Sequence, residues 1–524
     1  MVDVTHPQPA QAPLTRDQAT AYSALASFFR GISGLRHVEA IAAWDEATMM
    51  PEGSSNARAE ALSALRGLIH EQLGRADVAD WFSTSDQQAE QLLPWEKANL
   101  REMRRAWLQA VAVPRDLVEA ASLAESHCEQ AWRKLRPANN FSDFLPLLRE
   151  VVRLKREVAR HLGERLSMAP YDALLESFQP GLHQQHIAPL FARLRKVLPG
   201  LIGQAMTRQE KEIAPARQVQ ALRFPVEKQR KLVVEVMRRL GFDFGRGRLD
   251  TTHHPFCGGV AEDVRIAIRY HEDDFLPALA GVIHESGHGK YEQRLPAKWL
   301  GQPVAQARGA CIHESQSLLH EMQVGRSEAF LTFIAPIVAD ALGTPEDSGS
   351  AAFSAGELRR RLTRVTPSLV RVDADELTYP CHIILRFELE KGLFDGSLQV
   401  DDIPAAWDAG MRDLLGISTK GNDRDGCMQD VHWPAGLFGY FPSYLLGSLF
   451  AAQLFGAAKG ALPNLMDDIR RGAFDRLDSW LEKQIWGNGS FLDTTQLIED
   501  STGAPLGTEA FEAHVKSRYV LGES

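Results

Sequence analysis

The strongest chemical signal in the sequence is a pair of histidines four residues apart. His284 and His288 enclose Glu285 in the segment AGVIHESGHGKYEQ, residues 280–293. Four residues are about one helical turn, so both imidazoles leave one face if this segment is helical. In H-E-x-x-H, two neutral imidazoles bind one zinc ion, and the glutamate can act as general base on water. Chance predicts only about 0.03–0.04 such patterns in this chain, which favours metal binding over histidines that merely cap or pack.

The third metal ligand is not decided by spacing. A catalytic zinc usually takes three protein ligands and keeps a fourth position for water. The segment GACIHESQSLLHEMQVG, residues 309–325, offers Glu314 and Glu321, about two helical turns apart on one face. Either could complete a His2Glu set, and the alternative for each is an ordinary solvated glutamate.

Helices are expected to position these residues. Apolar residues recur at three- and four-residue spacings in 23–44, 96–111 and 144–162, which predicts amphipathic helices. Proline- and glycine-containing breakers at 49–55, 135–142 and 178–183 indicate the turns between helices. There is no internal repeat or low-complexity linker. We therefore predict a mainly α fold with one catalytic domain over 18–524, preceded by a disordered arm over 1–17.

One segment departs from the helical pattern. Residues 248–259 and 263–270 are rich in β-branched side chains, and apolar residues alternate along the second of them. This predicts a small antiparallel sheet joined through Gly258 and Gly259, just before the helix that carries His284. Such a sheet could serve as a substrate edge, because an extended peptide can add itself as a strand.

Composition excludes several classes of protein. The net charge of −10, with 44% hydrophobic and 24% charged residues, is typical of a soluble globular protein. The sequence has no stripe of basic residues of the kind that indicates nucleic-acid binding. The most apolar stretch, 444–458, is too short to span a membrane and is predicted to be a buried helix. The N-terminus has no apolar signal-peptide core, and five widely spaced cysteines form no CxxC pair. We expect a cytoplasmic protein without disulfides.

Motifs spread along the chain resemble one known family. They are WDEATMMPEGSSNAR (44–58), HPF (254–256), DVRIAIR (263–269), HESGH (284–288), HESQ (313–316), VRVDAD (370–375) and GCMQDVHW (426–433). In this order the sequence resembles the carboxypeptidase Taq family of zinc metallocarboxypeptidases, from about residue 20 to about residue 520. The resemblance implies a helical body with a deep groove, a homodimer, and peptide substrates with a free C-terminus. It selects Glu314 as third zinc ligand beside His284 and His288; cobalt can often replace zinc in such sites.

A carboxypeptidase must recognise the terminal carboxylate of its substrate. Arginine suits this task because its planar fork binds both oxygens. Arg371 lies among apolar neighbours before Asp373 and Asp375, so on sequence alone it could equally be a structural arginine paired with those aspartates. The resemblance favours the carboxylate-binding role for Arg371, and Arg265 and Arg269 are weaker candidates.

Other polar residues are candidates for contacts with the substrate. His432 could donate to the substrate or to the developing oxyanion, or it could be a core histidine satisfied by Asp430 or Gln429. Related helical zinc peptidases use a histidine and a downstream tyrosine to stabilise the tetrahedral intermediate. Tyr444 is preferred for this role and Tyr440 remains open.

The sheet region supplies a further pair of candidates. His254 of the HPF motif and Asp263 could shape the substrate edge, or could belong to a simple turn. Ala267 stands where the family usually has threonine. Loss of one hydrogen bond is worth about 0.5–1.5 kcal/mol, which would tune binding without abolishing it.

The predicted reaction is removal of one amino acid from the C-terminus of a peptide, with Glu285 as general base. Two alternatives remain. One is an oligoendopeptidase of the same H-E-x-x-H class, in which Arg371 is structural. The other is a helical scaffold with a vestigial site.

Overall fold

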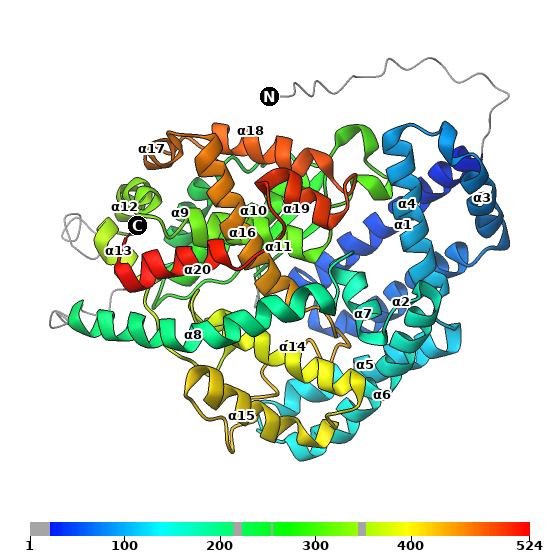
Figure 1. Cartoon of the computed structure of the whole chain (residues 1–524), viewed down its shortest axis with the longest axis horizontal. Helices are drawn as coiled ribbons and strands as arrows, with labels where there is room; N and C mark the ends of the chain where they lie inside the picture. Colours follow the sequence, from blue (N-terminus) through cyan, green and yellow to red (C-terminus); the bar gives the residue numbers. More distant parts are fainter. Residues whose placement is uncertain (1–20, 213–222, 253–254, 344–352, 524) are drawn as a thin grey trace.

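The computed structural model describes residues 21–212, 223–252, 255–343 and 353–523. Twenty α-helices and one three-stranded sheet form this part of the chain (Figure 1). The predicted mainly α fold is confirmed. The predicted disordered arm over 1–17 and the candidate His254 lie outside the described residues.

The first helices form a layer with its own small core. They are α1 (Ala21–Thr48), α2 (Ser55–Leu73), α3 (Ala76–Gln87) and α4 (Pro94–Val111). Leu25, Phe29, Val78, Phe82 and Met103 are buried together between them. In Figure 1 this blue layer lies at one side of the molecule.

The remaining helices surround a second, larger core. They are α5 (Arg115–Leu135), α6 (Phe141–Leu166), α7 (Pro170–Phe178), α8 (Gln184–Glu212), α9 (Val226–Arg239), α10 (Leu276–Gln293), α11 (Ala310–Leu318), α12 (Glu328–Leu342), α13 (Ala355–Leu362), α14 (Tyr379–Asp395), α15 (Ile403–Leu415), α16 (Pro442–Ala461), α17 (Leu465–Arg470), α18 (Asp475–Gln484), α19 (Thr494–Thr502) and α20 (Glu509–Val515).

Helices α10, α11 and α16 lie at the centre of this body (Figure 1). Helix α16 contains the apolar stretch 444–458, and its side chains are buried on nearly every side, as expected for a helix that is apolar all round. The prediction of a buried helix is confirmed. Among the described residues, no helix is both long and apolar enough to cross a bilayer.

The sheet contains β1 (Gly247–Thr251), β2 (Phe256–Val260) and β3 (Asp263–Ile268), in the order β1-β3-β2. Strands β2 and β3 pair antiparallel as predicted, but β1 pairs parallel to β3, so the sheet is mixed. The most buried strand, β3, takes the central position. Strands β1 and β3 both run opposite to β2, so the β1–β3 pair is parallel.

The glycines expected at the turn lie instead within β2. Gly258 and Gly259 pair with Arg265 and Val264, and the chain turns after Val260. Gly259 has a φ of 87°, and a Cβ there would lie 2.1 Å from the carbonyl oxygen of Asp263. Glycine is required because the two strands approach closely at this point.

Candidate metal centre and active site

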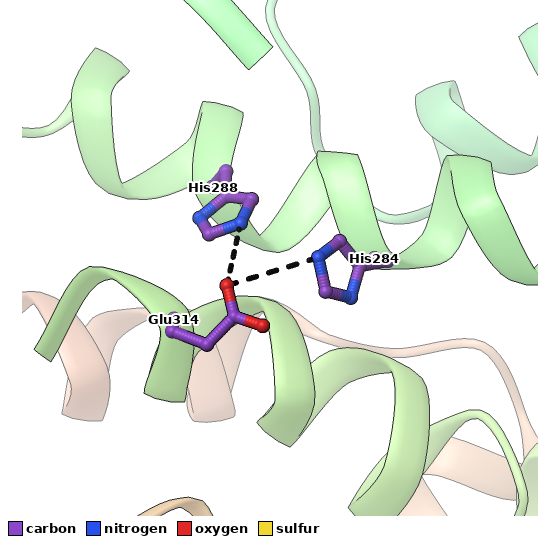
Figure 2. Close-up of side chains that lie close together, drawn as sticks. All are labelled: His284, His288 and Glu314. Atoms are coloured by element: carbon purple, nitrogen blue, oxygen red, sulfur yellow. Dashed lines mark ion pairs between the residues drawn. The ribbon is translucent and has the colours of Figure 1, made fainter. Parts of the chain in front are cut away.

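Helix α10 and helix α11 bring three potential metal ligands together (Figure 2). His284 and His288 leave α10 one turn apart, with ring centroids separated by 5.0 Å. Glu314 Oε2 on α11 lies 3.3 Å from His288 Nε2 and 4.0 Å from His284 Nε2. One ligand atom of each residue lies within 4.8 Å of the others, a group that could hold a metal ion.

Two glycines allow the helices to approach closely enough for this group to form. A Cβ at Gly287 would lie 2.4 Å from the carbonyl oxygen of Gln316 on α11. A Cβ at Gly447 on α16 would lie 2.9 Å from Cβ and Cγ of Glu314. Helix α11 therefore packs between α10 and α16, and a glycine of the neighbouring helix lies at each contact. This explains the glycine inside HESGH.

Glu321, the alternative third ligand, lies on the other side of His284. It belongs to a π-helical turn, η5 (Leu319–Val324). Its Oε2 is 2.9 Å from His284 Nδ1, and its Oε1 accepts a hydrogen bond of 2.7 Å from Arg326 Nη2. A carboxylate on Nδ1 orients the imidazole and leaves Nε2 for a metal. The geometry places Glu314, and not Glu321, in the group that could hold the ion.

His288 has a different partner, which the sequence reasoning missed. His313, the histidine of HESQ, has its Nδ1 2.5 Å from His288 Nδ1, and its Nε2 is 2.8 Å from Glu292 Oε1. The chain His288–His313–Glu292 can fix the tautomer of His288 as Glu321 can fix that of His284. The sequence did contain one hint of this support: Glu292 follows His288 by one helical turn, which places its carboxylate on the same face of the helix.

Carboxylates outnumber cations around the two imidazoles. Burial lowers the pKa of His284, but Glu314, Glu321 and Glu285 together raise it to about 10. Burial and the neighbouring His313 lower the pKa of His288 to about 4. A negative cluster of this kind attracts a cation, and imidazole with carboxylate is a typical ligand set for a first-row divalent metal.

Glu285 is buried beside the cluster, with 4% of its surface exposed. Its Oε2 has no hydrogen-bond partner among the described residues. Burial, with repulsion from Glu314, raises its pKa to about 7 against the opposing effect of His284. A carboxylate with a pKa near neutrality can both accept and return a proton.

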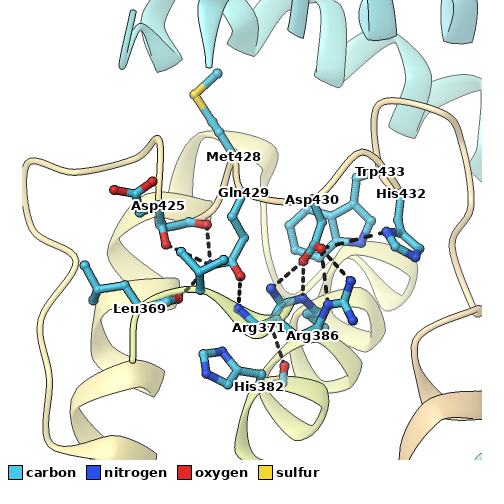
Figure 3. A network of polar contacts seen from close by, with 12 residues as sticks. Leu369, Arg371, His382, Arg386, Asp425, Met428, Gln429, Asp430, His432 and Trp433 are labelled. Atoms are coloured by element: carbon cyan, nitrogen blue, oxygen red, sulfur yellow. Dashed lines mark hydrogen bonds and ion pairs between the residues drawn. The ribbon is translucent and has the colours of Figure 1, made fainter. Parts of the chain in front are cut away.

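Arg371 lies in a short 3₁₀ turn, η7 (Arg371–Asp373), and is buried. Its Nη2 and Nε donate to Asp430 Oδ1 at 2.9 and 3.2 Å, and its Nη1 donates to Tyr379 at 3.3 Å. No ion pair joins it to Asp373 or Asp375 within the described ranges. The structural pairing with those aspartates that the sequence allowed is not found among the described residues, and Arg371 pairs with Asp430 instead (Figure 3).

A second buried arginine shares this aspartate, and the sequence reasoning did not identify it. Arg386 on α14 donates through Nε to Asp430 Oδ2 at 2.8 Å and is fully buried. Burial lowers the pKa of both nearby histidines, His382 and His432, to about 3, so both are neutral. Two guanidinium groups and one carboxylate leave an excess positive charge, which favours an anion.

His432, Tyr440 and Tyr444 connect this cluster to the metal group. His432 Nε2 lies 3.2 Å from the Tyr444 hydroxyl, and the two tyrosine rings are 5.3 Å apart. Burial, and next the charge of Glu314, raise the pKa of Tyr440 to about 12. Tyr444 lies under the Arg371 guanidinium, with 5.0 Å from its Cζ to the ring centroid. The residues predicted to contact the substrate therefore lie close to one another and to the metal group.

The sheet contributes its edge strand to the site. Burial raises the pKa of the Cys257 thiol in β2, and the charges of Glu285 and Glu292 raise it further, so β2 adjoins the general-base candidate. Asp263 and Arg265 pair with each other at 2.6 Å, and Arg269 is exposed. Ala267 is fully buried. Substrate contacts by Asp263, Arg265 and Arg269 remain predictions.

A helical body whose central helices enclose a His2Glu group, with a buried glutamate inside H-E-x-x-H, defines a metal-dependent hydrolase. Residues 24–519 match the family model described as Carboxypeptidase Taq (M32) metallopeptidase. The chain belongs to this family, and it is a metallocarboxypeptidase.

Relatives and solved structures agree over nearly the whole chain. Thermostable carboxypeptidase 1 of Thermus thermophilus is 37% identical over 510 residues, which cover 95% of this chain and 98% of the relative. Carboxypeptidase 1 of Bacillus subtilis is 32% identical, covering 93% and 96%. The structure of Trypanosoma cruzi metallocarboxypeptidase 1 superimposes with a TM-score of 0.92 at 38% identity, covering 95% and 99%. These matches do not favour an oligoendopeptidase or a vestigial scaffold.

Proposed function

We propose that this metallocarboxypeptidase is zinc-dependent and removes single amino acids from the C-terminus of peptides. The observation that carries the proposal is the adjacency of two sites. Tyr379 links the two: its hydroxyl accepts a hydrogen bond from Arg371 of the buried arginine cluster, and burial, with the charge of Glu314 in the His2Glu group, raises its pKa.

His284, His288 and Glu314 would hold the metal. The fit is supported by their converging nitrogen and oxygen atoms and by the surrounding carboxylates. Zinc, or cobalt in its place, would supply Lewis acidity to the scissile carbonyl and to the attacking water. Glu321 and His313 would keep both imidazoles oriented.

Glu285 is the proposed proton carrier. It would take a proton from the attacking water and deliver it to the leaving amine. A pKa near neutrality suits both steps, and its unpartnered Oε2 leaves one oxygen available for water.

Arg371 is the proposed anchor for the terminal carboxylate. Its hydrogen bonds to Asp430 and Tyr379 use three N–H groups, and a guanidinium carries five. The remaining groups can donate to an anion. Arg386 occupies the second oxygen of Asp430, so that Asp430 does not neutralise Arg371 completely.

His432 with Tyr444 would stabilise charge that develops on the scissile carbonyl oxygen. Their mutual hydrogen bond holds both groups in place, and a neutral His432 can act as donor or acceptor. Tyr440 is the alternative donor because its ring adjoins that of Tyr444.

Product analysis by mass spectrometry tests the proposal. A free-acid peptide should lose residues one at a time from its C-terminus, and a chelator should stop the reaction. The same peptide with an amidated C-terminus should be cleaved poorly. Internal cleavage of the amidated peptide would show an endopeptidase instead.

A homodimer is proposed from the family resemblance, and a cytoplasmic location from the five widely spaced, free cysteines. Light scattering on the purified protein tests the assembly, and cell fractionation tests the location.

A further inference from the structure

Behind His284, a chain of buried polar contacts leads away from the metal group. Glu321 contacts His284 Nδ1 with one oxygen and Arg326 Nη2 with the other. Both members of this ion pair are largely buried, with side-chain exposures of 15% for Glu321 and 11% for Arg326. The orientation of the imidazole therefore depends on where Arg326 is held.

Two buried carboxylates, Glu321 and Glu376, act on the charge of Arg326. Burial lowers its pKa, but the charge of Glu321 first, followed by Tyr519 and Glu376, raises it above the ordinary value. Glu376, which is 1% exposed, is the second carboxylate. Glu376 acts on Arg326 through its charge, so this effect depends on the other partners that hold Glu376 in place.

The C-terminal segment supplies those other partners. Helix α20 and the π-helical turn η10 (Lys516–Leu521) carry three residues whose side chains contact Glu376. His514 Nε2 lies 2.7 Å from Glu376 Oε1, and Arg518 Nη1 and the Tyr519 hydroxyl lie 2.9 and 2.6 Å from Oε2. These contacts fix the positions of Glu376 and of the Tyr519 hydroxyl, the two groups that after Glu321 raise the pKa of Arg326.

A second link joins the same segment to the backbone around Glu321. Arg518 donates through Nη1 to the carbonyl oxygen of Met322 and through Nη2 to that of Gln323, at 3.4 Å. Both carbonyls belong to η5, the turn that carries Glu321. The C-terminal segment therefore reaches the support of His284 by two routes, which share Arg518.

We propose that the segment from His514 to Tyr519 is a positioning element of the metal centre. It holds Arg326 and η5 so that Glu321 keeps His284 Nε2 turned toward Glu314. The inference rests on the proposed metal site, and it assigns a role to residues at the far end of the chain that do not touch the metal group.

The support of His288 provides an internal comparison. His313 and Glu292 come from α11 and α10, and their ion pair is more exposed, at 24% and 26%. None of the contacts that join these residues involves the C-terminal segment. Changes at the C-terminus should therefore disturb His284 while leaving the support of His288 in place.

The test measures metal binding and metal geometry on the full-length protein. Arg326→Gln, Arg326→Lys and Tyr519→Phe are each stripped of metal and titrated with zinc against a competing chelator. The cobalt forms are compared by visible absorption, and the metal-free forms by thermal unfolding. Loss of a direct partner of a metal ligand typically weakens binding about 10- to 100-fold, and because Arg326 acts one contact further out, we expect about 10-fold for Arg326→Gln. Tyr519→Phe should weaken it less, by about 3- to 10-fold, and Arg326→Lys should restore part of the loss.

Glu512→Gln is the matched control. Glu512 lies on α20 but pairs with Arg193 at the surface, at 2.6 and 2.9 Å, away from Glu376. This variant should keep the zinc affinity and the cobalt spectrum of the unchanged protein. An equal loss in Glu512→Gln would overturn the proposal, because it would indicate general loosening of the C-terminal helix.

The remaining outcomes also decide the matter. Unchanged zinc affinity and cobalt spectra in Arg326→Gln and Tyr519→Phe, with lowered melting temperatures only, would reduce the segment to a structural element. If Arg326→Gln does not fold, Arg326→Lys and Tyr519→Phe carry the test. Failure of the unchanged protein to bind metal at all would overturn the proposed function, and this inference with it.

Discussion

Asp430 accepts hydrogen bonds from Nη2 and Nε of Arg371 across 59 residues of sequence, and it pairs with Arg386 through its other oxygen. Arg371 is therefore held in position by the carboxylate of Asp430, which it shares with Arg386. This arrangement keeps the guanidinium ordered while leaving positive charge for a substrate.

Replacement of Arg371 by methionine should affect free-acid peptides selectively. Loss of a buried charge pair costs about 2–5 kcal/mol. Allowing for solvent access, we expect kcat/KM for free-acid peptides to fall about 10- to 1,000-fold, at 1.4 kcal/mol per decade. The already slow cleavage of amidated peptides should barely change, and Arg371→Lys should rescue only part of the activity. Steady-state kinetics on matched acid and amide peptides measures this, and equal losses on both would make Arg371 purely structural.

The ligand assignment predicts a ranking of metal retention. His284→Ala and His288→Ala should each empty the site, because two protein ligands rarely hold a catalytic zinc firmly. Glu314→Gln should weaken retention more than Glu321→Gln, since Glu321 acts only through His284 Nδ1. Metal content after dialysis gives the ranking. Normal zinc in Glu314→Gln with loss in Glu321→Gln would reverse the assignment.

Glu285→Gln should separate metal binding from turnover. The amide cannot accept the proton of the attacking water, and loss of a general base costs about 10²–10⁴ in rate. Metal content should stay near one ion per chain. Substantial turnover in a fully metallated Glu285→Gln protein would assign the base elsewhere.

Gly287→Ala should disturb the metal group through helix packing. The added Cβ would lie 2.4 Å from the carbonyl oxygen of Gln316, so α10 and α11 must separate. Overpacking of this kind typically costs about 1–3 kcal/mol, and it should also weaken zinc binding. Gly281→Ala on the same helix is the control, because among the described residues its Cβ would meet Pro255 alone, at an ordinary 3.9 Å. Unfolding of both variants by urea, with zinc titration, compares them.

Glu390 should make stability depend on pH. It accepts hydrogen bonds from Trp433, Tyr171 and the backbone N–H of Gly439, but burial raises its pKa to about 7. The unfolded carboxyl has a lower pKa, so the folded state binds the proton more tightly, and this contribution is fully present below about pH 4.5. It is lost as the pH rises toward 7, by about 3–4 kcal/mol at most.

Urea unfolding of the metal-free protein at several pH values, beside Glu390→Gln, measures this contribution. The stability of the unchanged protein relative to Glu390→Gln should fall as the pH rises toward 7. A difference that does not vary with pH would show that the pKa of Glu390 is the same in the folded and unfolded states.

Local sequence patterns were sufficient to predict much of the site. The helical class follows from apolar spacing within single segments. The shared face of His284 and His288 follows from the period of one helix. The buried helix over 444–458 follows from its composition. In each case the residues that decide the outcome lie within a few turns of one another.

Only the tertiary structure decided the partners of these residues. The sequence alone does not distinguish Glu314 from Glu321 as the third ligand. The packing of α11 between α10 and α16 places Glu314, and not Glu321, near the Nε2 atoms of both His284 and His288. The partner of Arg371 is Asp430 and not the nearby Asp373 or Asp375. Likewise, β1 pairs parallel to β3, which takes the centre of the sheet. These outcomes depend on contacts between segments distant in sequence, where close packing selects one arrangement among several that local chemistry allows.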